Sequence, residues 1–470
     1  MFCNCCIISD EVIGMTHTRN LTSGNVKKII FTFFMPLLFT NLMQQIYSFA
    51  DTAIVGKGLG DASLAAVGNM SSLTFLIIGF SMGMTNGFSI LIAQSYGAGD
   101  AKQLRKAIAA SVKLSAVIAL FLTAVSISFL HTIMKVMQTP ESILHESLTY
   151  GYIIFGGLAA TIAYNMCAAI LRALGDSRTP FIAIIVSTIV NIVLDCVCIF
   201  VLGTGVEGAA AATIAAQVIS ASICFSRLRK IEMIHLSRED FAYDGRMYMQ
   251  LLKNGLPMAC MNSITAVGCI VVQYFVNGLG VAYTSAYSAC SKYINMFMLP
   301  GVTAGYTISS FTSQNYGAGE YQRIREGVKV CAEIAFGSYL ILGSVMFFFP
   351  SVLAGIILSG DDSIALASEF LPICGVMLFA VDLLFVFRQC VQGMGYPFVP
   401  MCSGILEMFL RISVIIIFIP VLGFRATALA EVSAWSGALL TNFIAYQVNI
   451  RRSVNGKAAD TEKKVCSACR

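Results

Sequence analysis

Charged residues are scarce in this sequence, at 12% of 470 residues, while hydrophobic residues reach 57% and the mean hydropathy is +0.79. Ordinary soluble domains carry about 25% charged residues, so this composition excludes one. The apolar runs are continuous and do not alternate in polarity, which excludes a membrane β-barrel. We expect no cleavable signal peptide, because residues 1–26 lack a long apolar core. The sequence therefore predicts a helical membrane protein.

Signatures of enzymes are missing as well. The four histidines share no spacing typical of metal ligands, and no G-x-x-x-x-G-K-[ST] loop for nucleotide phosphates is present. We therefore expect a protein that is not an enzyme, needs no cofactor and has no ATPase of its own. The net charge of +5 does not indicate a nucleic-acid partner, because membrane topology explains where the positive residues lie.

Twelve apolar stretches are each long enough to cross the hydrocarbon core of a membrane, which takes about 20 residues of helix. They cover residues 28–53, 64–93, 107–134, 147–170, 181–202, 208–226, 251–277, 283–313, 328–350, 363–391, 398–419 and 426–450. If the termini share one side, 24 Lys and Arg residues lie on that side and 3 on the other. By the positive-inside rule, we expect both termini in the cytosol and the protein in the cytoplasmic membrane, surrounded by lipid.

The chain contains two copies of one unit. Residues 94–100 read Gln-Ser-Tyr-Gly-Ala-Gly-Asp, and residues 314–320, 220 positions later, read Gln-Asn-Tyr-Gly-Ala-Gly-Glu. The same displacement relates Gly175 to Gly395. The repeated Tyr-Gly-Ala-Gly sequence predicts a turn that ends a helix rather than a glycine-rich binding loop. Each copy contains six of the apolar stretches, so we expect an all-α membrane protein with 12 transmembrane helices in two pseudo-symmetric six-helix bundles that form a V-shaped central cavity.

The repeat also predicts how the chain is divided. We expect a cytosolic N-terminal tail, a first lobe, a cytosolic linker, a second lobe and a cytosolic C-terminal tail, at residues 1–26, 27–226, 227–250, 251–450 and 451–470. Two start sites for translation remain open within the N-terminal tail, Met1 and Met15.

Few ionisable side chains are predicted at membrane depth, where each costs about 3 kcal/mol and so indicates a functional site. Asp51 lies near the end of the first predicted helix, Asp195 within the fifth, and Asn191 one turn before Asp195 on the same face. Thr213, early in the sixth helix, can reach them because the connecting loop is short. Two carboxylates, an amide and a hydroxyl suit a hard cation or a shared proton. The alternatives are an interfacial Asp51 and a structural Asp195.

The acidic residues are not repeated in the second copy. The positions equivalent to the four candidate site residues hold Val272, Arg411, Ile415 and Ser433. Glu407 and Arg411 stand four residues apart and are expected to pair within one helix. Lys292 and Asp382 are the other charges expected to be buried in this half, and they either pair with each other or line a cavity.

Four segments resemble the multidrug and toxic compound extrusion (MATE) transporters, most of all the prokaryotic branch related to the DNA-damage-inducible F protein. They read Asp-Thr-Ala-Ile-Val-Gly, Gln-Ser-Tyr-Gly-Ala-Gly, Leu-Arg-Ala-Leu-Gly-Asp-Ser-Arg-Thr-Pro and Gln-Asn-Tyr-Gly-Ala-Gly, at residues 51–56, 94–99, 171–180 and 314–319. The resemblance extends over residues 25–450 and includes helix count and repeat. It implies a cation site in the first lobe formed by Asp51, Asn191, Asp195 and Thr213.

The resemblance also implies that Pro36 is a point at which the first helix can bend, and that the cleft of the first lobe is lined by Gln44, Tyr47 and Asn165. One feature departs from the other bacterial branch: residues 257–277 contain no Asp or Glu, so coupling through the second lobe is in doubt. Asp382 lies in the helix that holds a further acid in that branch, but its register does not settle whether the two correspond.

The function implied is export of amphipathic, cationic small molecules from the cytoplasm in exchange for Na⁺ or H⁺, by a protein expected to act as a monomer. No metal other than a coupling Na⁺ is expected. One alternative is a flippase for lipid-linked oligosaccharides of the same superfamily, which predicts extra helices or a strongly cationic cavity. Another is a receptor or scaffold that transports nothing, which predicts a sizeable soluble domain. Neither prediction fits this sequence.

Overall fold

The computed structural model describes the chain from Asn20 to Ala468, with side chains as far as Asn455. The proposed start at Met15 lies outside these residues. The first repeat forms α1 (Val26–Leu59), α2 (Asp61–Gly97), α3 (Ala101–Val136), α4 (Glu141–Gly156), α5 (Leu158–Ala173), α6 (Arg178–Cys196), the π-helical turn η1 (Val197–Val201) and α7 (Gly205–Leu228). The linker contains two short 3₁₀ helices, η2 (Glu232–Ile234) and η3 (Arg238–Phe241).

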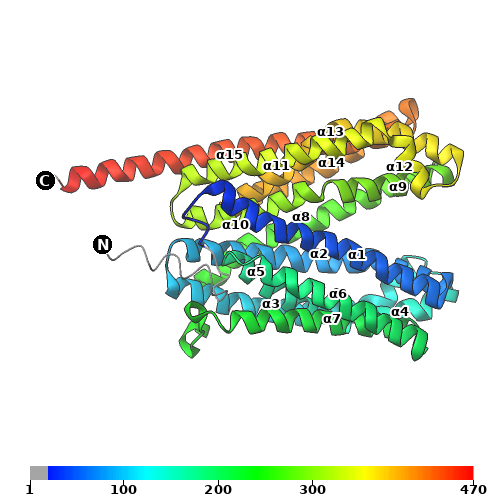
Figure 1. The fold of residues 1–470 in the computed structure, drawn as a ribbon, viewed down its shortest axis with the longest axis horizontal. Helices are drawn as coiled ribbons and strands as arrows, with labels where there is room; N and C mark the ends of the chain where they lie inside the picture. Colours follow the sequence, from blue (N-terminus) through cyan, green and yellow to red (C-terminus); the bar gives the residue numbers. More distant parts are fainter. Residues whose placement is uncertain (1–19, 469–470) are drawn as a thin grey trace, which may run out of the picture.

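The second repeat is helical throughout its described residues. It forms α8 (Gly245–Asn277), α9 (Val281–Phe297), α10 (Leu299–Gly317), α11 (Tyr321–Phe348), α12 (Pro350–Ile357), α13 (Asp361–Gly393), α14 (Phe398–Leu422) and α15 (Arg425–Ala468). Figure 1 shows α2–α7 in one half of the molecule and α8–α15 in the other, with the helices running along the long axis.

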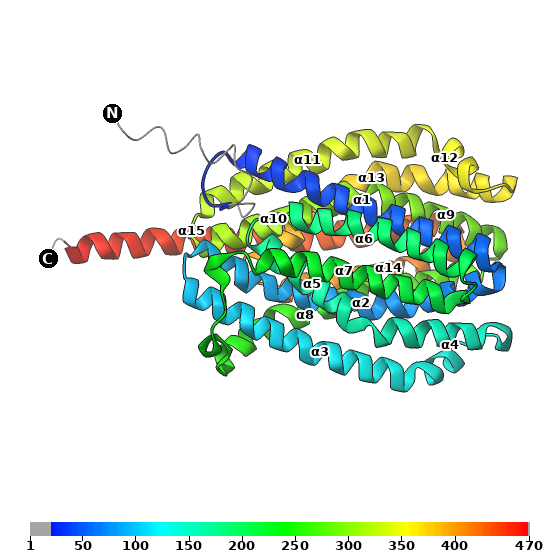
Figure 2. The same cartoon turned by 60° about the horizontal axis from the view of Figure 1, so that its bottom comes forward.

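Nine of the described helices are long and apolar enough to cross a membrane, and α4 with α5 forms a tenth span that is bent by 44°. Helices α9 and α10 follow each other along the long axis, and α15 runs parallel to them, which gives the remaining two spans (Figures 1 and 2). The protein is thus an all-α membrane protein with twelve transmembrane segments in two bundles, as the sequence predicts.

Two predicted spans are interrupted in the structure. The span at 147–170 breaks between α4 and α5 at Gly157, where a Cβ atom would lie 2.2 Å from the Ile214 side chain. The span at 283–313 breaks between α9 and α10, because Pro300 stands in the first turn of α10 and suits a helix start better than a helix interior.

The repeated glycine sequence ends a helix in both copies, as predicted. Helix α2 ends at Gly97 and α10 at Gly317, and each is followed by a glycine with positive φ, 72° at Gly99 and 73° at Gly319. Glycine adopts this left-handed conformation without the steric cost that a Cβ atom brings. The chain can therefore reverse directly into α3 and α11.

The first helix of each repeat lies between the two bundles. Helix α1 packs against α6 of its own repeat and against α10 of the other, while α8 packs against α14 and α2. The crossing of α2 and α8 is very close: a Cβ atom on Gly87 would lie 2.4 Å from the Cα atom of Gly255. Small residues allow such close backbone approach, and the resulting van der Waals packing is one of the forces that hold membrane helices together.

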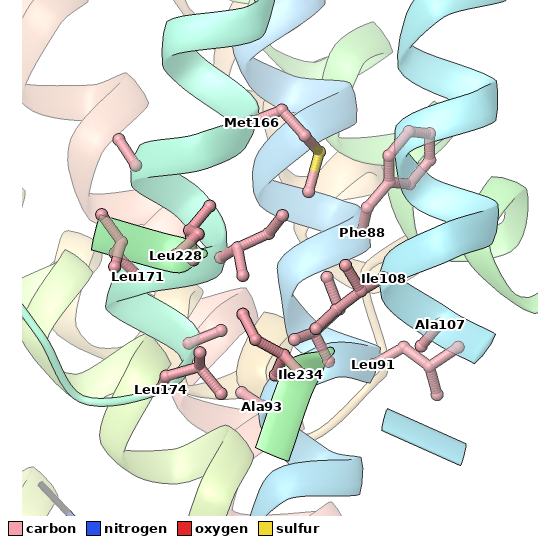
Figure 3. Packing of buried hydrophobic residues seen from close by; sticks show 14 of the residues in the cluster. Phe88, Leu91, Ala93, Ala107, Ile108, Met166, Leu171, Leu174, Leu228 and Ile234 are labelled. Atoms are coloured by element: carbon pink, nitrogen blue, oxygen red, sulfur yellow. The ribbon is translucent and has the colours of Figure 1, made fainter. Parts of the chain in front are cut away.

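The linker is anchored to the first bundle. Ile234 of η2 is 7% exposed and joins a buried cluster that contains Phe88 and Leu228, shown in Figure 3. Asp240 of η3 is also 7% exposed and accepts hydrogen bonds from the backbone and hydroxyl of Ser237 at 2.8 and 2.9 Å. Its carboxylate lies 3.5 Å from Nε of Arg105 on α3. These contacts hold the linker against the end of α3.

Replacing Asp240 by asparagine should loosen the linker. Burial alone would raise the pKa of the Asp240 carboxyl, but the Ser237 hydrogen bonds and Arg105 hold it below the ordinary value of 3.8. Because the folded pKa is lowered, this carboxylate stabilises the docked linker above pH 3.8 and the contribution is lost as pH falls through the lowered pKa. Limited proteolysis of the linker at neutral pH should be faster in Asp240→Asn and unchanged in Glu239→Gln, whose side chain is exposed. Equal cleavage of both variants would contradict this role.

Candidate functional site

Asp51 and Asp195 come together where α1 packs along α6. Their carboxyl groups lie close enough to interact directly with each other. Asp195 is 0% exposed, and neither of its oxygens accepts a hydrogen bond of normal length among the described residues, although the Asn191 amide lies close enough to interact with it. Oδ1 of Asp51 likewise has no hydrogen-bond partner in the described chain. Two facing carboxylates without donors repel each other unless a proton or a cation lies between them. A proton or a cation between the two carboxyl groups would therefore relieve this repulsion.

Neutral oxygen atoms surround the pair. Asn191, one turn before Asp195 on α6, is 0% exposed, lies beside Asp195, and makes no hydrogen bond with either amide atom in the described chain. On α1, one turn before Asp51, the Tyr47 hydroxyl donates to Oγ1 of Thr213 on α7 at 3.3 Å. No group of three or more His, Cys, Asp or Glu side chains gathers anywhere in the described residues. The oxygens are those that hard cations prefer.

Tyr150 lies near this pair and Gln217 lies beyond Thr213 on α7, and neither is predicted from the sequence. Tyr150 of α4 is close enough to Asp51, Asp195 and Tyr47 to interact with them electrostatically. Gln217 stands one turn after Thr213 on α7, and its Oε1 is buried without a partner among the residues described. The four-residue spacing from Thr213 could have indicated Gln217, whereas nothing local in the sequence indicates Tyr150.

The backbone of α6 changes immediately after Asp195. A π-helical turn, η1, begins at Val197, and such turns are frequent at functional sites. The end of α1 lies against η1, where a Cβ atom on Gly58 would be 2.4 Å from the Ile199 side chain. The carboxylate pair therefore lies next to an irregular turn that is in close contact with α1.

The residues expected to line a cleft occupy different surroundings. Gln44 is exposed on α1, and Tyr47 is half-buried one turn further along. Asn165 on α5 is half-buried with an unpartnered Nδ2 atom, and no described hydrogen bond joins it to the others. Pro36 lies inside α1, which continues as one helix past it, and the carbonyl of Pro36 accepts a hydrogen bond from Thr40 at 2.7 Å.

The second repeat contains hydrophobic core at the equivalent place. Val272 and Ile415, which stand where the first repeat has Asp51 and Asp195, are both 0% exposed and belong to one hydrophobic cluster. Arg411, the equivalent of Asn191, is 3% exposed and donates to Glu407 at 3.3 Å and to Glu431 of α15 at 2.9 Å. The pairing of Glu407 with Arg411 expected from their spacing is present.

Arg388 extends this buried charge network. It is one of the 24 Lys and Arg residues that the sequence assigns to the cytosolic side, but it lies on α13, is 4% exposed and donates to Glu407 at 2.6 Å. Tyr287 of α9 donates to Glu431 at 3.3 Å at the other end of the network. The location of Arg388 and Glu431 within apolar stretches could have shown that both are buried. Two arginines and two glutamates balance, so the network is neutral.

The side chain of Lys292 is exposed on α9 and so is not buried as expected, while its position along a cavity stays a prediction. Asp382 on α13 is 0% exposed, and among the described residues neither of its oxygens has a hydrogen-bond donor. It lies against α10, where a Cβ atom on Gly301 would be 2.2 Å from Oδ1 of Asp382. No ion pair in the described chain joins it to Lys292, so the pairing considered for these two residues is not formed.

Comparison with known proteins gives one consistent result. The MatE sequence family matches residues 36–197 and 257–417, one segment in each repeat. The probable multidrug resistance protein YoeA of Bacillus subtilis is 28% identical over 368 residues, which cover 76% of this chain and 79% of that protein. DNA damage-inducible protein F of Escherichia coli is 24% identical over 401 residues, 78% of this chain and 81% of that protein.

The fold is that of solved structures as well. A crystal structure of MATE in the bent conformation superposes with a TM-score of 0.88 and 22% identity, covering 94% of this chain and 99% of that chain. A crystal structure of MATE in the straight conformation gives the same TM-score of 0.88 and covers 94% of this chain and 100% of that chain. Because more than half of the sequence matches the family, in both repeats, the chain belongs to the MatE family and is a multi-span membrane transporter of the multidrug and toxic compound extrusion type.

Proposed function

We propose that this protein is an antiporter that exports amphipathic, cationic small molecules across the cytoplasmic membrane in exchange for Na⁺ or H⁺. The observation that carries the proposal is the pair Asp51 and Asp195, two carboxyl groups within reach of each other and without donors for Asp195 in the described chain. A structural carboxylate at membrane depth is normally paired or hydrogen-bonded. This pair instead requires positive charge from outside the chain.

Either coupling ion fits the surroundings. One proton shared between the carboxyl groups removes their repulsion. A sodium ion would be held by the same two carboxylates, the Asn191 carbonyl oxygen and the Thr213 and Tyr47 hydroxyls, with water or backbone oxygens completing its shell. In both cases the site changes its charge by one unit when the ion binds, and among the described residues no ion pair joins either carboxylate to a cationic side chain.

Helix α1 is the element that can transmit this change. It carries Asp51 and Tyr47 at the site, and nearer its start Asn41 donates to Thr303 of the other bundle at 2.8 Å. Pro36 removes one backbone hydrogen bond from α1 and so lowers the cost of bending there. An ion that binds more tightly to one arrangement of α1 than to the other shifts the balance between them, which is what coupling requires.

The substrate class is supported by the relatives and by the pairing of the buried Arg388 and Arg411 in the described chain. YoeA is named a probable multidrug resistance protein, and amphipathic substrates suit a mostly apolar cavity wall. A lipid-linked oligosaccharide flippase would need cationic groups for phosphate, but the buried Arg388 and Arg411 are both paired with glutamates. We further propose a monomer surrounded by lipid, with both termini in the cytosol, since the positive residues gather at that end.

The test is transport by the purified full-length protein in liposomes loaded with a fluorescent cationic drug. We expect efflux driven by an imposed Na⁺ gradient, by an imposed pH gradient, or by both, and the comparison identifies the ion. Drug movement that ignores both gradients would contradict antiport. Drug movement that requires ATP would contradict it as well.

A further inference from the structure

The repeated sequence that ends α2 and α10 forms bonds between the two bundles. Nε2 of Gln94, on α2, donates to the backbone carbonyl of Gly393 at the end of α13, at 3.1 Å. Nε2 of Gln314, on α10, donates to the carbonyl of Ala173 at the end of α5, at 2.7 Å. Each glutamine thus reaches from its own bundle to the other. The displacement of 220 residues that relates the two glutamines also relates their acceptors, so the two bonds are symmetric.

Two glycines make this approach possible. A Cβ atom on Gly97 would lie 1.9 Å from the carbonyl oxygen of Gln314, and one on Gly317 would lie 2.0 Å from that of Gln94. These distances are far inside van der Waals contact, and the atoms met are backbone, which cannot rotate away. Gly97 and Gly317 are therefore required for the ends of α2 and α10 to touch. We call Gln94, Gly97, Gln314 and Gly317 the clasp.

The segment before α1 strengthens the clasp on one side. The backbone N–H of Leu21, a residue that is 1% exposed, donates to Oε1 of Gln314 at 2.9 Å. Arg323 of α11 donates to the carbonyl of Gly24 at 2.9 Å. Gln314, itself 0% exposed, thus joins the lead-in to α1, the second bundle and the first bundle through one side chain.

Two further hydrogen bonds between the repeats lie elsewhere along the molecule. Asn41 of α1 donates to Thr303 of α10 at 2.8 Å, and Asn262 of α8 donates to the carbonyl of Gly79 of α2 at 3.0 Å. The two asparagines also stand at equivalent positions of the repeats. Both pairs join helices that belong to different repeats, and both must separate if the bundles move apart at the end where the positive residues gather.

We propose that the clasp is the cytosolic gate of this transporter, the contact that closes the path from the cytoplasm and opens when substrate enters. The inference rests on the alternating access of the proposed function but not on the identity of the coupling ion. Few bonds are involved, and each net hydrogen bond changes an equilibrium by only about fivefold, so the contact can open during a cycle. The tight glycine crossing gives the closed state a single geometry.

Hydrogen–deuterium exchange of the full-length protein in lipid nanodiscs tests the glycine contact. Gly97→Ala and Gly317→Ala should accelerate exchange at the ends of α2 and α10 by about tenfold or more, because overpacking forces the helices apart. Gly68→Ala, on the same α2 but with no atom within 4 Å of its Cβ position, is the matched control and should not change exchange there. Alanine favours helix over glycine, so a stabilising effect at all three sites would overturn the proposal.

Side-chain truncations keep the proposal testable if the glycine variants fail to fold. Gln314→Ala removes two hydrogen bonds, and Gln94→Ala removes one. Exchange at the clasp should rise about fivefold for each lost bond, and therefore more in Gln314→Ala than in Gln94→Ala. Asn449→Ala, which loses only a bond within its own helix, is the control. Drug efflux should fall in both glutamine variants. If neither exchange nor efflux changes in these variants, the clasp is not the gate, whichever ion is coupled. If exchange at the clasp changes but transport ignores both ion gradients, only the proposed antiport is refuted.

Discussion

Replacing Asp195 by asparagine should abolish the response of drug efflux to a cation gradient while the protein still folds. Asparagine has the shape of aspartate but cannot change its charge, so it removes the repulsion within the pair that a proton or Na⁺ relieves. Coupling free energies between ligand sites typically correspond to about 5- to 150-fold changes in affinity, and we expect the acceleration by the gradient to fall by at least about tenfold. The measurement is efflux from liposomes at matched protein amounts, with and without the gradient.

The same experiment distinguishes a paired Asp51 from an interfacial one. If Asp51 and Asp195 hold one ion together, Asp51→Asn should lose coupling to the same extent, and the double variant should lose no more than either single one. Asp61→Asn, an exposed carboxylate at the start of α2, is the control and should keep full coupling. Full coupling in Asp51→Asn would leave Asp51 with a merely interfacial role and would contradict the paired site.

The largest effect on stability is expected from Arg411. Arg411→Met removes the cation that lies between Glu407 and Glu431, and leaves the buried Glu431 carboxylate with only the Tyr287 hydroxyl. Breaking a buried ion pair by removing one partner costs about 3–5 kcal/mol, because the remaining charge stays desolvated. We expect a marked drop in the thermal unfolding temperature of the detergent-solubilised protein, measured by light scattering or by calorimetry.

Two further variants show whether the unpaired charge is the cause. Adding Glu431→Gln to Arg411→Met should recover part of the lost stability, since the buried carboxylate is then neutral. Arg425→Ala breaks the exposed pair with Glu369, whose side chains are 58% and 45% exposed and 3.1 Å apart, and should cost no more than about 1 kcal/mol. A drop as large for Arg425→Ala as for Arg411→Met would show that burial does not govern the effect.

The sequence predicted the class of fold because lipid leaves so few alternatives. Continuous apolar stretches, the repeat and the uneven distribution of Lys and Arg together predicted twelve helical spans and two halves. The breaks at Gly157 and Pro300 were missed, because a long apolar stretch looks the same whether one helix or two shorter helices cross it. The contact of Gly97 with Gln314 was also missed, since a glycine that ends a helix does not reveal which distant backbone lies against it.

Prediction of the candidate site was strongest where helical spacing determined the geometry. Asn191 and Asp195 share a face because they are four residues apart, and Tyr47 precedes Asp51 by the same interval. The meeting of Asp51 with Asp195 was implied by the family resemblance rather than by spacing. Tyr150 and the π-helical turn after Asp195 depend on how three helices pack, and that information is not local to any segment.

The buried network around Arg411 has a consequence for how the two halves differ. Arg411 stands where the first repeat has Asn191, so the second half holds a positive charge among its carboxylates that is covalently part of the chain. This positive charge belongs to a side chain and cannot dissociate into the solution on either side of the membrane, so an ion gradient cannot act on it. At this pair of equivalent positions, the proposed exchange of a mobile cation is therefore open only to the first half. At the equivalent place the second half carries the positive charge of Arg411 permanently, paired with Glu407 and Glu431.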